Sequence, residues 1–457
     1  MAAPPDEQTP GNAEAPDDVL GDASAGGTLA SGTPASGTPA SGTPASGTPA
    51  SGTPRVLRTA SVRLNRAGEV RVRRGHPWIF EDMIARAPAT AAAGDVATLY
   101  DTRNRLVAVG LFDPSSPIRV RVWAGPGERI DEALFVERLT ASVARRASVA
   151  SARTTGYRVV NGPNDAMPGV VLDRYDRTLV LKLYAASLLP HLPSLVRAIE
   201  QVLAPDVLVL RLSRAVAAHE LAAQLADGVT ILGALDDGPV AFLENGVVFE
   251  ADPLRGQKTG FFLDQRDNRA LLERRTPQGA RVLNVFAYSG GFSLYAARAG
   301  ASHVTSLDLS PHALAQAERH MALNAQRDAR VAAAEHRSLC GDAFAELQRL
   351  RDAGESFDVV VIDPPSFAKR AAERERALVS YGRLARLGAA LVRPGGLLVL
   401  ASCSSRVDAA SFRSASEQGV SAAGRRFEVV DVTGHAPDHP ATIEEAEYLK
   451  AVWMRLR

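Results

Sequence analysis

Cysteine is scarce in this chain, with only Cys340 and Cys403 among 457 residues. Two thiols cannot build a disulfide framework, and such low usage is typical of a reducing compartment. The opening MAAPPDEQ lacks the basic and apolar stretches of a secretory signal. Nowhere do about 18 apolar residues run together, so a membrane-spanning helix is not expected. We therefore expect a cytoplasmic protein that does not associate with a membrane.

Lysine is also rare, because nearly all of the 52 basic residues are arginine. The formal net charge of +1 hides an uneven distribution. Residues 1–54 contain six acidic residues and no basic one, whereas residues 55–125 contain twelve arginines and six acidic residues. Arginine binds phosphate and stacks on bases better than lysine does, although genomic base composition would also enrich it. The basic module predicts an anionic partner.

Residues 1–54 lack the apolar content that a core requires, and they include five copies of Ala-Ser-Gly-Thr-Pro from Ala30 to Pro54. We expect a disordered tail without a catalytic role. The rest of the chain is long enough for two or three domains with their own cores. Shifts in composition and pattern divide it into residues 55–125, 126–245 and 246–457.

Residues 55–125 have the pattern of short strands separated by glycine and proline. The segment Ile118–Trp123 alternates with a period of two, which places Arg119, Arg121 and Trp123 on one strand face. An exposed face of arginine and an aromatic residue is suited to RNA. A solvated strand face without a ligand would have the same pattern.

Further basic residues precede His76–Phe80, among them Arg73 and Arg74, and they favour the RNA interpretation. His76 has no second ligand at metal-binding spacing, so we interpret it as structural and expect no metal site. Residues 126–245 contain a helix at 131–150, strands at Val170–Leu172 and Leu179–Leu183, and a helix at Leu192–Leu203. No chemical motif stands out there, and this segment is interpreted as a platform between the basic module and the last domain.

From residue 246 onward, apolar strands alternate with helices. The expected strands are Arg281–Phe286, Val304–Asp308, Arg337–Cys340, Phe357–Ile362, Gly396–Ser402, Phe427–Val432 and Tyr448–Arg455. We expect the last two to form an antiparallel pair joined by a short loop. The pattern predicts an open, doubly wound α/β sheet of seven strands, with a ligand at the carboxyl ends of the strands.

The stretch Val282–Ser310 consists of a strand, a glycine turn, a helix and a strand that ends in Asp308. Gly290 and Gly291 let the backbone approach a ligand, and an acid about 20 residues further on can bind ribose hydroxyls. No Gly-x-Gly-x-x-Gly is present in this turn, so a nucleoside with an amino-acid tail fits better than NAD. Tight packing of strand on helix would use the same glycines without any ligand.

The most specific signal is a buried strand, Phe357–Ile362, that ends in Asp363-Pro364-Pro365. Two prolines cannot join a ladder, so they aim Asp363 out of the carboxyl edge of the sheet. Cys403 follows the next strand and is expected in the same cleft, where a thiol acts as a nucleophile. The alternatives are that Asp363 caps a helix and that Cys403 is an inert thiol. Lys369 is placed to bind a phosphate, or it is merely solvated.

These motifs resemble class I S-adenosylmethionine-dependent methyltransferases. More narrowly, they resemble the bacterial large-subunit rRNA 5-methylcytosine methyltransferase I family, which carries an N-terminal PUA domain that binds RNA. The similarity extends from about Arg58 to the C-terminus, and the repeat tail has no counterpart. The matching segments are His76–Phe80, Ile118–Trp123, Asp165–Asp173, Lys258–Arg266, Phe286–Phe292, Asp363–Phe367 and Ser402–Ser404.

The resemblance implies that Asp308 holds the ribose of S-adenosylmethionine and that Asp342 lies near its adenine. The other residues that the resemblance assigns to the cofactor are Asn284, Tyr288, Ser289, Gly290, Gly291, Gln257, Lys258 and Arg266. RNA would contact Arg73, Arg74, Arg119, Arg121, Trp123 and Lys369. Relatives tend to have Pro-Glu where this chain has Glu444-Glu445, so no role is transferred to that loop.

The resemblance further implies methylation of carbon 5 of a cytosine in 23S rRNA through a covalent Cys403 adduct, with Asp363 on the N3/N4 edge of a flipped base. The partner would be RNA, as 23S rRNA or an assembling large subunit, and not DNA. One alternative is methylation of a guanine nitrogen, which the Ser366 that follows Pro-Pro makes less favourable because related enzymes carry an aromatic there. Another is a non-catalytic RNA-binding assembly factor.

Overall fold

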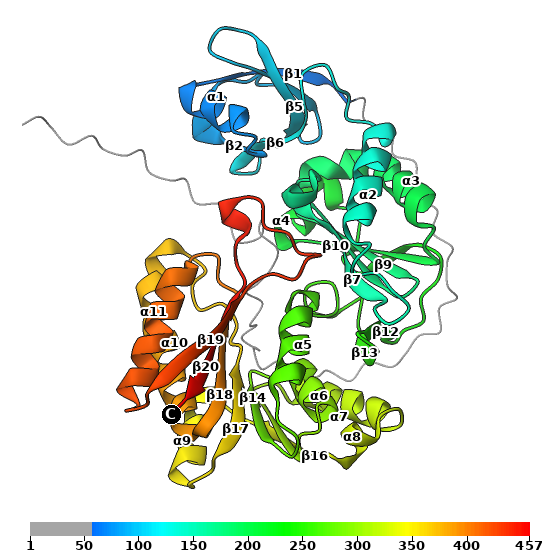
Figure 1. Ribbon diagram of the computed structural model, residues 1–457. Helices are drawn as coiled ribbons and strands as arrows, with labels where there is room; N and C mark the ends of the chain where they lie inside the picture. Colours follow the sequence, from blue (N-terminus) through cyan, green and yellow to red (C-terminus); the bar gives the residue numbers. More distant parts are fainter. Residues whose placement is uncertain (1–56) are drawn as a thin grey trace, which may run out of the picture.

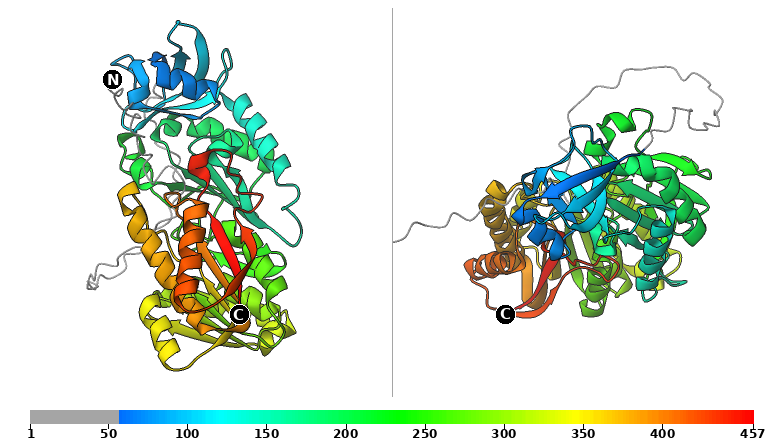
Figure 2. Two further views of the ribbon diagram at one scale, coloured as in Figure 1. Left: turned by 60° about the vertical axis from the view of Figure 1, so that its left-hand side comes forward. Right: turned by 90° about the horizontal axis from the view of Figure 1, so that it is seen from above.

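A computed structural model describes residues 57–457. The chain forms three parts stacked end to end, with the N-terminal part at one end and the C-terminal sheet at the other (Figure 1). Figure 2 shows the same arrangement from two other sides. The predicted disordered tail and its repeats lie outside the described residues. No helix among the described residues is long and apolar enough to cross a membrane.

The first part is built on a six-stranded sheet in the order β2-β6-β5-β4-β1-β3. Its elements are β1 (Thr59–Leu64), α1 (Arg66–Arg73), β2 (Trp78–Phe80), β3 (Ile84–Arg86), β4 (Val96–Tyr100), β5 (Leu106–Phe112) and β6 (Ile118–Ala124). Alternate apolar side chains such as Val62, Leu99 and Val120 form its core. Asn65 begins α1, because its side chain accepts a hydrogen bond from the Gly68 amide.

The prediction that Arg121 and Trp123 lie on an exposed face of β6 is wrong. Arg121 and Trp123 are only 1% and 3% exposed, because this face packs against the second part of the chain. The Trp123 ring meets Phe135 edge to face, with ring centroids 5.4 Å apart. Burial lowers the pKa of Arg121 to about 10. Arg119 is partly buried and forms an ion pair with Glu81.

The second part contains a five-stranded sheet in the order β11-β10-β9-β8-β7. Its elements are α2 (Glu132–Arg145), β7 (Gly156–Asn161), β8 (Val170–Tyr175), β9 (Thr178–Leu183), α3 (Leu192–Leu203), β10 (Val207–Leu212), α4 (Arg214–Ala217) and β11 (Val229–Leu232). The predicted helix Leu192–Leu203 is confirmed with these bounds, whereas the helix expected at 131–150 ends at Arg145. A hairpin of β12 (Val240–Glu244) and β13 (Val247–Ala251) follows.

The third part is a seven-stranded sheet in the order β16-β15-β14-β17-β18-β20-β19. Its strands are β14 (Arg281–Val285), β15 (His303–Asp308), β16 (Glu335–Cys340), β17 (Phe357–Ile362), β18 (Val392–Ser402), β19 (Phe427–Thr433) and β20 (Lys450–Leu456). Its helices are α5 (Arg266–Arg275), α6 (Gly291–Arg298), α7 (Pro311–Ala325), α8 (Ala329–Ala333), α9 (Ala343–Asp352), α10 (Arg374–Leu391) and α11 (Ala409–Ala422). The predicted doubly wound sheet and its antiparallel final pair are confirmed.

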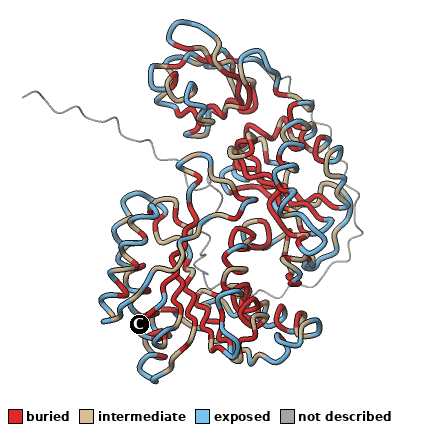
Figure 3. The backbone as a smooth tube through the Cα atoms, in the orientation of Figure 1, coloured by how far each residue is buried: buried red, intermediate tan, exposed pale blue. Residues whose placement is uncertain are grey.

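The apolar cores cross the expected domain boundary at residues 245 and 246. That boundary falls inside the β12–β13 hairpin, whose Phe242 and Phe249 pack in one cluster with Val209 of the second part and Val282 of the seven-stranded sheet. Buried residues, red in Figure 3, are concentrated in both the five-stranded and the seven-stranded sheet. The second and third parts therefore share one core.

The loop between β19 and β20, residues 434–449, corrects the expectation of a short connection. It leaves the sheet and rises between the other two parts, as the red segment in Figure 1 shows. Asn161 of the second part donates to the Pro440 carbonyl. Glu445 accepts hydrogen bonds from Arg71 and His76 of the first part. We refer to residues 434–449 as the strap.

Candidate active site

The carboxyl edges of β17 and β18 bring Asp363 and Cys403 together, as expected. The two strands are parallel neighbours in which Ile362 lies opposite Leu400. The Cys403 Sγ lies 3.9 Å from the carbonyl oxygen of Pro364, the residue after Asp363. Both side chains are partly buried, so they remain open to a ligand.

A second carboxylate, Asp264, lies beside Asp363 and differs from it in protonation. Burial and the charge of Asp264 raise the pKa of Asp363 to about 7. Lys258 lies 2.8 Å from Asp264 and helps to hold the pKa of that carboxyl well below its usual range, against the effect of burial. One carboxyl group therefore stays ionised while its neighbour exchanges a proton near neutral pH, which is typical of an acid–base site.

The Cys403 thiol is protonated in the free protein. Burial and the neighbouring Asp363 raise its pKa to about 12, and the charges of Lys258 and Lys450 oppose that rise. Lys450, the first residue of β20, donates to the carbonyls of Ser404 and Val407 and so fixes the turn after Cys403. Burial lowers the pKa of Lys450 to about 8. The thiol therefore needs a base at the moment of reaction.

The carboxyl ends of β14 and β15 supply groups that fit a nucleoside. Asp308 accepts hydrogen bonds from the amides of Tyr288 and Ser310 and is partly exposed, so its oxygens have room for ribose hydroxyls. The next residue, Leu309, is 71% exposed and offers an apolar surface to a planar base. S-Adenosylmethionine combines these chemical features with an amino-acid tail. These groups therefore fit that cofactor.

The glycine turn has a different basis from the one expected. Gly290 has a φ of 77°, and a Cβ there would lie 2.7 Å from the Cβ of Ala317 in α7. A Cβ on Gly291 would lie 2.9 Å from Arg269. Both glycines are thus needed for close packing within the protein, in addition to any approach by a ligand.

Four residues that the resemblance assigns to the cofactor differ in their burial and in their partners. Asn284 is 1% exposed and donates to Ser293 beneath α6, so its side chain does not reach the cleft. Arg266 is 4% exposed and pairs with Asp438 of the strap. Gln257 and Asp342 are exposed, and Asp342 caps α9 through the Ala345 amide. The cofactor roles of these four residues stay predictions.

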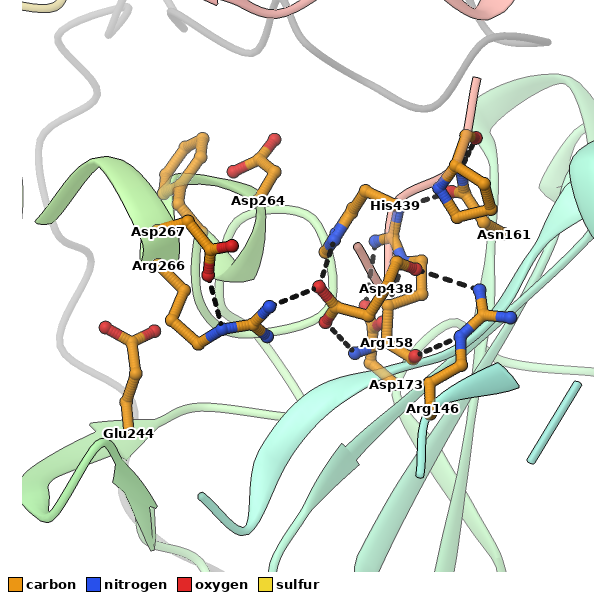
Figure 4. A network of polar contacts seen from close by, with 12 residues as sticks. Arg146, Arg158, Asn161, Asp173, Glu244, Asp264, Arg266, Asp267, Asp438 and His439 are labelled. Atoms are coloured by element: carbon orange, nitrogen blue, oxygen red, sulfur yellow. Dashed lines mark hydrogen bonds and ion pairs between the residues drawn. The ribbon is translucent and has the colours of Figure 1, made fainter. Parts of the chain in front are cut away.

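A buried polar network joins the strap to the second part of the chain (Figure 4). Asp438 accepts from the amide of Arg158 and pairs with Arg266 at 2.9 Å. Its own carbonyl accepts from Arg146 at 2.8 Å. Arg158 is also held by Asp173, which accepts from Thr259 at 2.6 Å. The middle segment therefore does more than separate its neighbours, because its charged residues support the segment from Lys258 to Arg266.

The predicted RNA-binding residues are spread over different environments. Arg74 is exposed and lines a cleft of about 1250 Å³ between the first part, the second part and the strap. Arg73 is held by Glu69 and Asp101. Lys369 is exposed, beyond Asp363 on the chain.

The same cleft contains hydrogen-bond donors without acceptors. Within the described residues, the Trp123 indole nitrogen and the Arg138 Nε have no acceptor, although both atoms are buried. Buried donors of this kind are normally satisfied, so a ligand with oxygen or nitrogen acceptors suits this cleft. Trp123 thus borders the cleft without presenting its ring on an open face.

Sequence reasoning missed four residues of the site. Asp264 and Gln265 stand inside a segment that was recognised, but no feature of the pattern separates them from their neighbours. Tyr448 donates to Asp264 at 2.9 Å from the end of the strap. Lys450 was seen only as part of a strand. A charged residue at the start of a mostly apolar final strand was the available signal.

The sheet order, with its one antiparallel strand, and the groups at its carboxyl edge define a methyltransferase of the doubly wound class. A family model described as S-adenosylmethionine-dependent methyltransferase matches residues 169–455, and a model of a PUA-like domain matches residues 62–124. The chain belongs to the S-adenosylmethionine-dependent methyltransferase family, with a PUA-like domain at its N-terminal side. S-Adenosylmethionine is the cofactor of that family.

Relatives cover nearly the whole chain. A protein of Deinococcus radiodurans named ribosomal RNA large subunit methyltransferase is 46% identical, over 86% of this chain and 97% of its own length. A protein of Shewanella amazonensis named ribosomal RNA large subunit methyltransferase I is 33% identical, over 86% of this chain and 99% of its own length.

Two solved structures share the fold. One is described as a SAM-dependent methyltransferase from Streptococcus mutans, with a TM-score of 0.73, 21% identity, and coverage of 86% of this chain and 99% of that one. The other is described as a methyltransferase complexed with SAH, with a TM-score of 0.73 and 22% identity, covering 87% of this chain and 100% of that one.

Proposed function

We propose that this protein methylates carbon 5 of a cytosine in the RNA of the large ribosomal subunit, with Cys403 as the nucleophile. The relatives named for ribosomal RNA of the large subunit support the substrate class. The observation that carries the choice of base is the meeting of a thiol and an exchangeable carboxyl group at one sheet edge.

Carbon 5 of cytosine is a poor nucleophile, and addition of a thiolate at carbon 6 makes it enamine-like. Ionised Asp363 takes the proton from the Cys403 sulfur and passes it to ring nitrogen N3 as the sulfur–carbon 6 bond forms. S-Adenosylmethionine, when bound, supplies the electrophilic methyl group that carbon 5 takes. Loss of the carbon 5 proton to water then expels Cys403 as a thiolate, and the proton on N3 returns through Asp363 to the Cys403 sulfur.

The residues around Asp363 support this cycle. Lys258 and Asp264 provide a fixed ion pair beside the reacting pair, and Lys450 holds the turn that carries Cys403. Asp308 and Leu309 would hold the nucleoside end of the cofactor on the neighbouring strand. The cleft bordered by Arg74 would take the RNA, which must present an unstacked base to the sheet edge.

Methylation of a guanine nitrogen is disfavoured by the position of Phe367. This aromatic ring is partly buried and packs on Tyr381, with centroids 5.1 Å apart, against the core beneath the sheet edge. It is therefore not presented for stacking on a base.

The test uses Cys403→Ala with Cys340→Ser as the matched control, because Cys340 is the other thiol and is exposed. Each variant is incubated with S-adenosylmethionine and unmodified large-subunit RNA, and nucleosides are analysed by mass spectrometry. We expect 5-methylcytidine from the wild type and Cys340→Ser, and none from Cys403→Ala with cofactor binding intact by calorimetry. Formation of 5-methylcytidine by Cys403→Ala at near the wild-type rate, or of a methylguanosine by the wild type, contradicts the proposal.

A further inference from the structure

A chain of hydrogen bonds runs from the middle of the sheet to Asp363. The Trp453 indole nitrogen donates to the Thr433 hydroxyl at 3.0 Å, and Thr433 donates to the Asn268 amide oxygen at 2.6 Å. The Asn268 amide nitrogen donates to the Gln265 oxygen at 2.6 Å, and the Gln265 nitrogen donates to Asp363 Oδ2 at 2.8 Å. Trp453, Asn268 and Gln265 are at most 4% exposed.

The direction of this chain is fixed at its far end. An indole N–H can only donate, so Thr433 must accept from Trp453, and its hydrogen finds its acceptor in Asn268. If both amides were reversed, the Thr433 hydroxyl hydrogen would lose that acceptor. A hydroxyl that loses its partner costs about 1–3 kcal/mol where it is buried. Thr433 therefore biases Asn268 and Gln265 to the orientation in which every bond donates toward Asp363.

The two carboxylate oxygens of Asp363 therefore differ in their hydrogen bonds. Oδ2 is occupied by the Gln265 N–H, and Oδ1 accepts no hydrogen bond from the described residues. A proton that arrives at Asp363 is thus directed to Oδ1. Among the described residues, the Gln265 side chain has hydrogen bonds with Asn268 and Asp363, so it acts on the reaction through Asp363.

We propose that Gln265 is a positioning residue that keeps the exchangeable proton of Asp363 on Oδ1, where it is offered to a ring nitrogen acceptor such as cytosine N3. This inference rests on the proposed function, because it assigns the choice of pyrimidine within that reaction. The thiol proton moves from the Cys403 sulfur to Asp363 Oδ1 and from there to N3. Uracil carries a hydrogen on N3 and therefore cannot accept that proton.

If the side-chain amides of Asn268 and Gln265 were reversed, Asp363 would no longer favour cytosine over uracil. Gln265 would then present its oxygen to Asp363, the proton would be retained on Oδ2, and Oδ1 would face the cleft as a bare acceptor. A bare acceptor matches the N3–H of uracil and does not match cytosine N3. The same change also stabilises the protonated carboxyl, so Asp363 would hold its proton to higher pH.

The matched pair Thr433→Val and Thr433→Ser tests the inference. Valine has the shape of threonine without the hydroxyl, whereas serine keeps the hydroxyl, and neither change touches Asp363 or the cofactor groups. With large-subunit RNA, we expect Thr433→Val to lower the rate of 5-methylcytidine formation about tenfold and to lower the ratio of 5-methylcytidine to 5-methyluridine, because one well-placed hydrogen bond is worth about tenfold. Thr433→Ser should stay within about twofold of the wild type, and the affinity for S-adenosylmethionine should not change.

A second readout needs no RNA. In a Cys340→Ser background, iodoacetamide alkylation of Cys403 is followed against pH, because the charge of Asp363 acts on that thiol. The charge of Asp363 raises the pKa of that thiol, so the ionisation of Asp363 appears as an inflection in the alkylation profile. That inflection should shift to higher pH in Thr433→Val, whereas a merely structural role would leave it in place. If Thr433→Val does not fold, Gln265→Met replaces it, with the same expected loss of rate and pH shift.

The outcomes separate the two proposals. Equal product ratios and equal alkylation profiles for Thr433→Val and Thr433→Ser overturn the role of Gln265 while leaving the proposed function intact. A shifted alkylation profile without any methylated pyrimidine from the wild type supports the orientation of Asp363 and overturns the proposed function.

Discussion

The Asp438 carboxylate lies 2.9 Å from the Arg266 guanidinium, and both side chains are buried where the strap meets the start of α5. Burial alone would raise the pKa of Asp438, but His439 and Arg266 hold it well below its usual range. This pair therefore stays ionised inside the protein. Removal of one partner leaves the other without its buried counter-charge.

We expect Asp438→Asn to lower the free energy of unfolding by about 3 kcal/mol, because Arg266 loses its buried counter-charge and keeps only the exposed Asp267. The measurement is urea denaturation followed by circular dichroism. The matched control is Asp267→Asn, since Asp267 pairs with the same arginine but is 52% exposed. That change should cost less than about 1 kcal/mol. Equal losses for the two variants would contradict this account.

The pH dependence of stability follows from Asp363. Its pKa is about 7 in the fold against 3.8 for the free group, so the folded state binds the proton more tightly than the unfolded chain does. The cost of ionising it is absent at low pH and grows as the pH rises toward 7. Asp363→Asn removes that cost, so its gain in Tm over the wild type should increase between about pH 5 and pH 8. A gain that does not vary with pH over this interval would disprove the assignment.

The glycine turn predicts a packing defect. Gly290→Ala places a methyl group 2.7 Å from Ala317 at a φ of 77°, so both strain and overlap result. Gly354 has a φ of 72° with open space around it, and Gly354→Ala isolates the strain alone. We expect Gly354→Ala to cost about 1 kcal/mol and Gly290→Ala to cost at least about 1 kcal/mol more. Calorimetric unfolding with and without S-adenosylmethionine measures the stability of both variants. Similar losses of stability would contradict the predicted overlap with Ala317.

RNA binding should depend on Arg74 and not on Arg121. Arg74 is exposed on the cleft, so Arg74→Ala should weaken binding to RNA and reduce the slope of log K against log salt by about 1. Arg121 is 1% exposed, and Arg121→Met should leave that slope unchanged. Fluorescence anisotropy at several salt concentrations measures both. A smaller slope for Arg121→Met would show that the buried face of β6 opens on binding.

Local patterns predicted the catalytic sheet well, because buried parallel strands appear in the sequence as continuous apolar runs. The Phe357–Ile362 strand and its abrupt end at Asp363 could be seen without any tertiary knowledge. The same kind of reasoning failed at β6. Alternation shows that Arg121 and Trp123 share a face, but it contains no information about the element that covers that face.

The sequence predicted only part of the candidate site, for a related reason. Asp363 and Cys403 each follow a recognisable strand, so their meeting was predictable. The groups that set their chemistry come from residues 258–265, α5, β19, β20 and the strap. Each has an ordinary polar neighbourhood in the sequence. Gln265 gains its role only when Thr433 and Trp453 come within hydrogen-bonding distance.

The strap has both of its ends in the reaction centre and its tip against the PUA-like domain. It follows directly after Thr433, which belongs to the hydrogen-bond chain that ends at Asp363. Its far end carries Tyr448, which donates to Asp264. Between them Glu445 is tethered to Arg71 at 2.6 Å. Under the proposed function, RNA docking beside the PUA-like domain and recognition of the pyrimidine at the sheet edge would share one piece of backbone. Shortening the strap is therefore expected to uncouple the two.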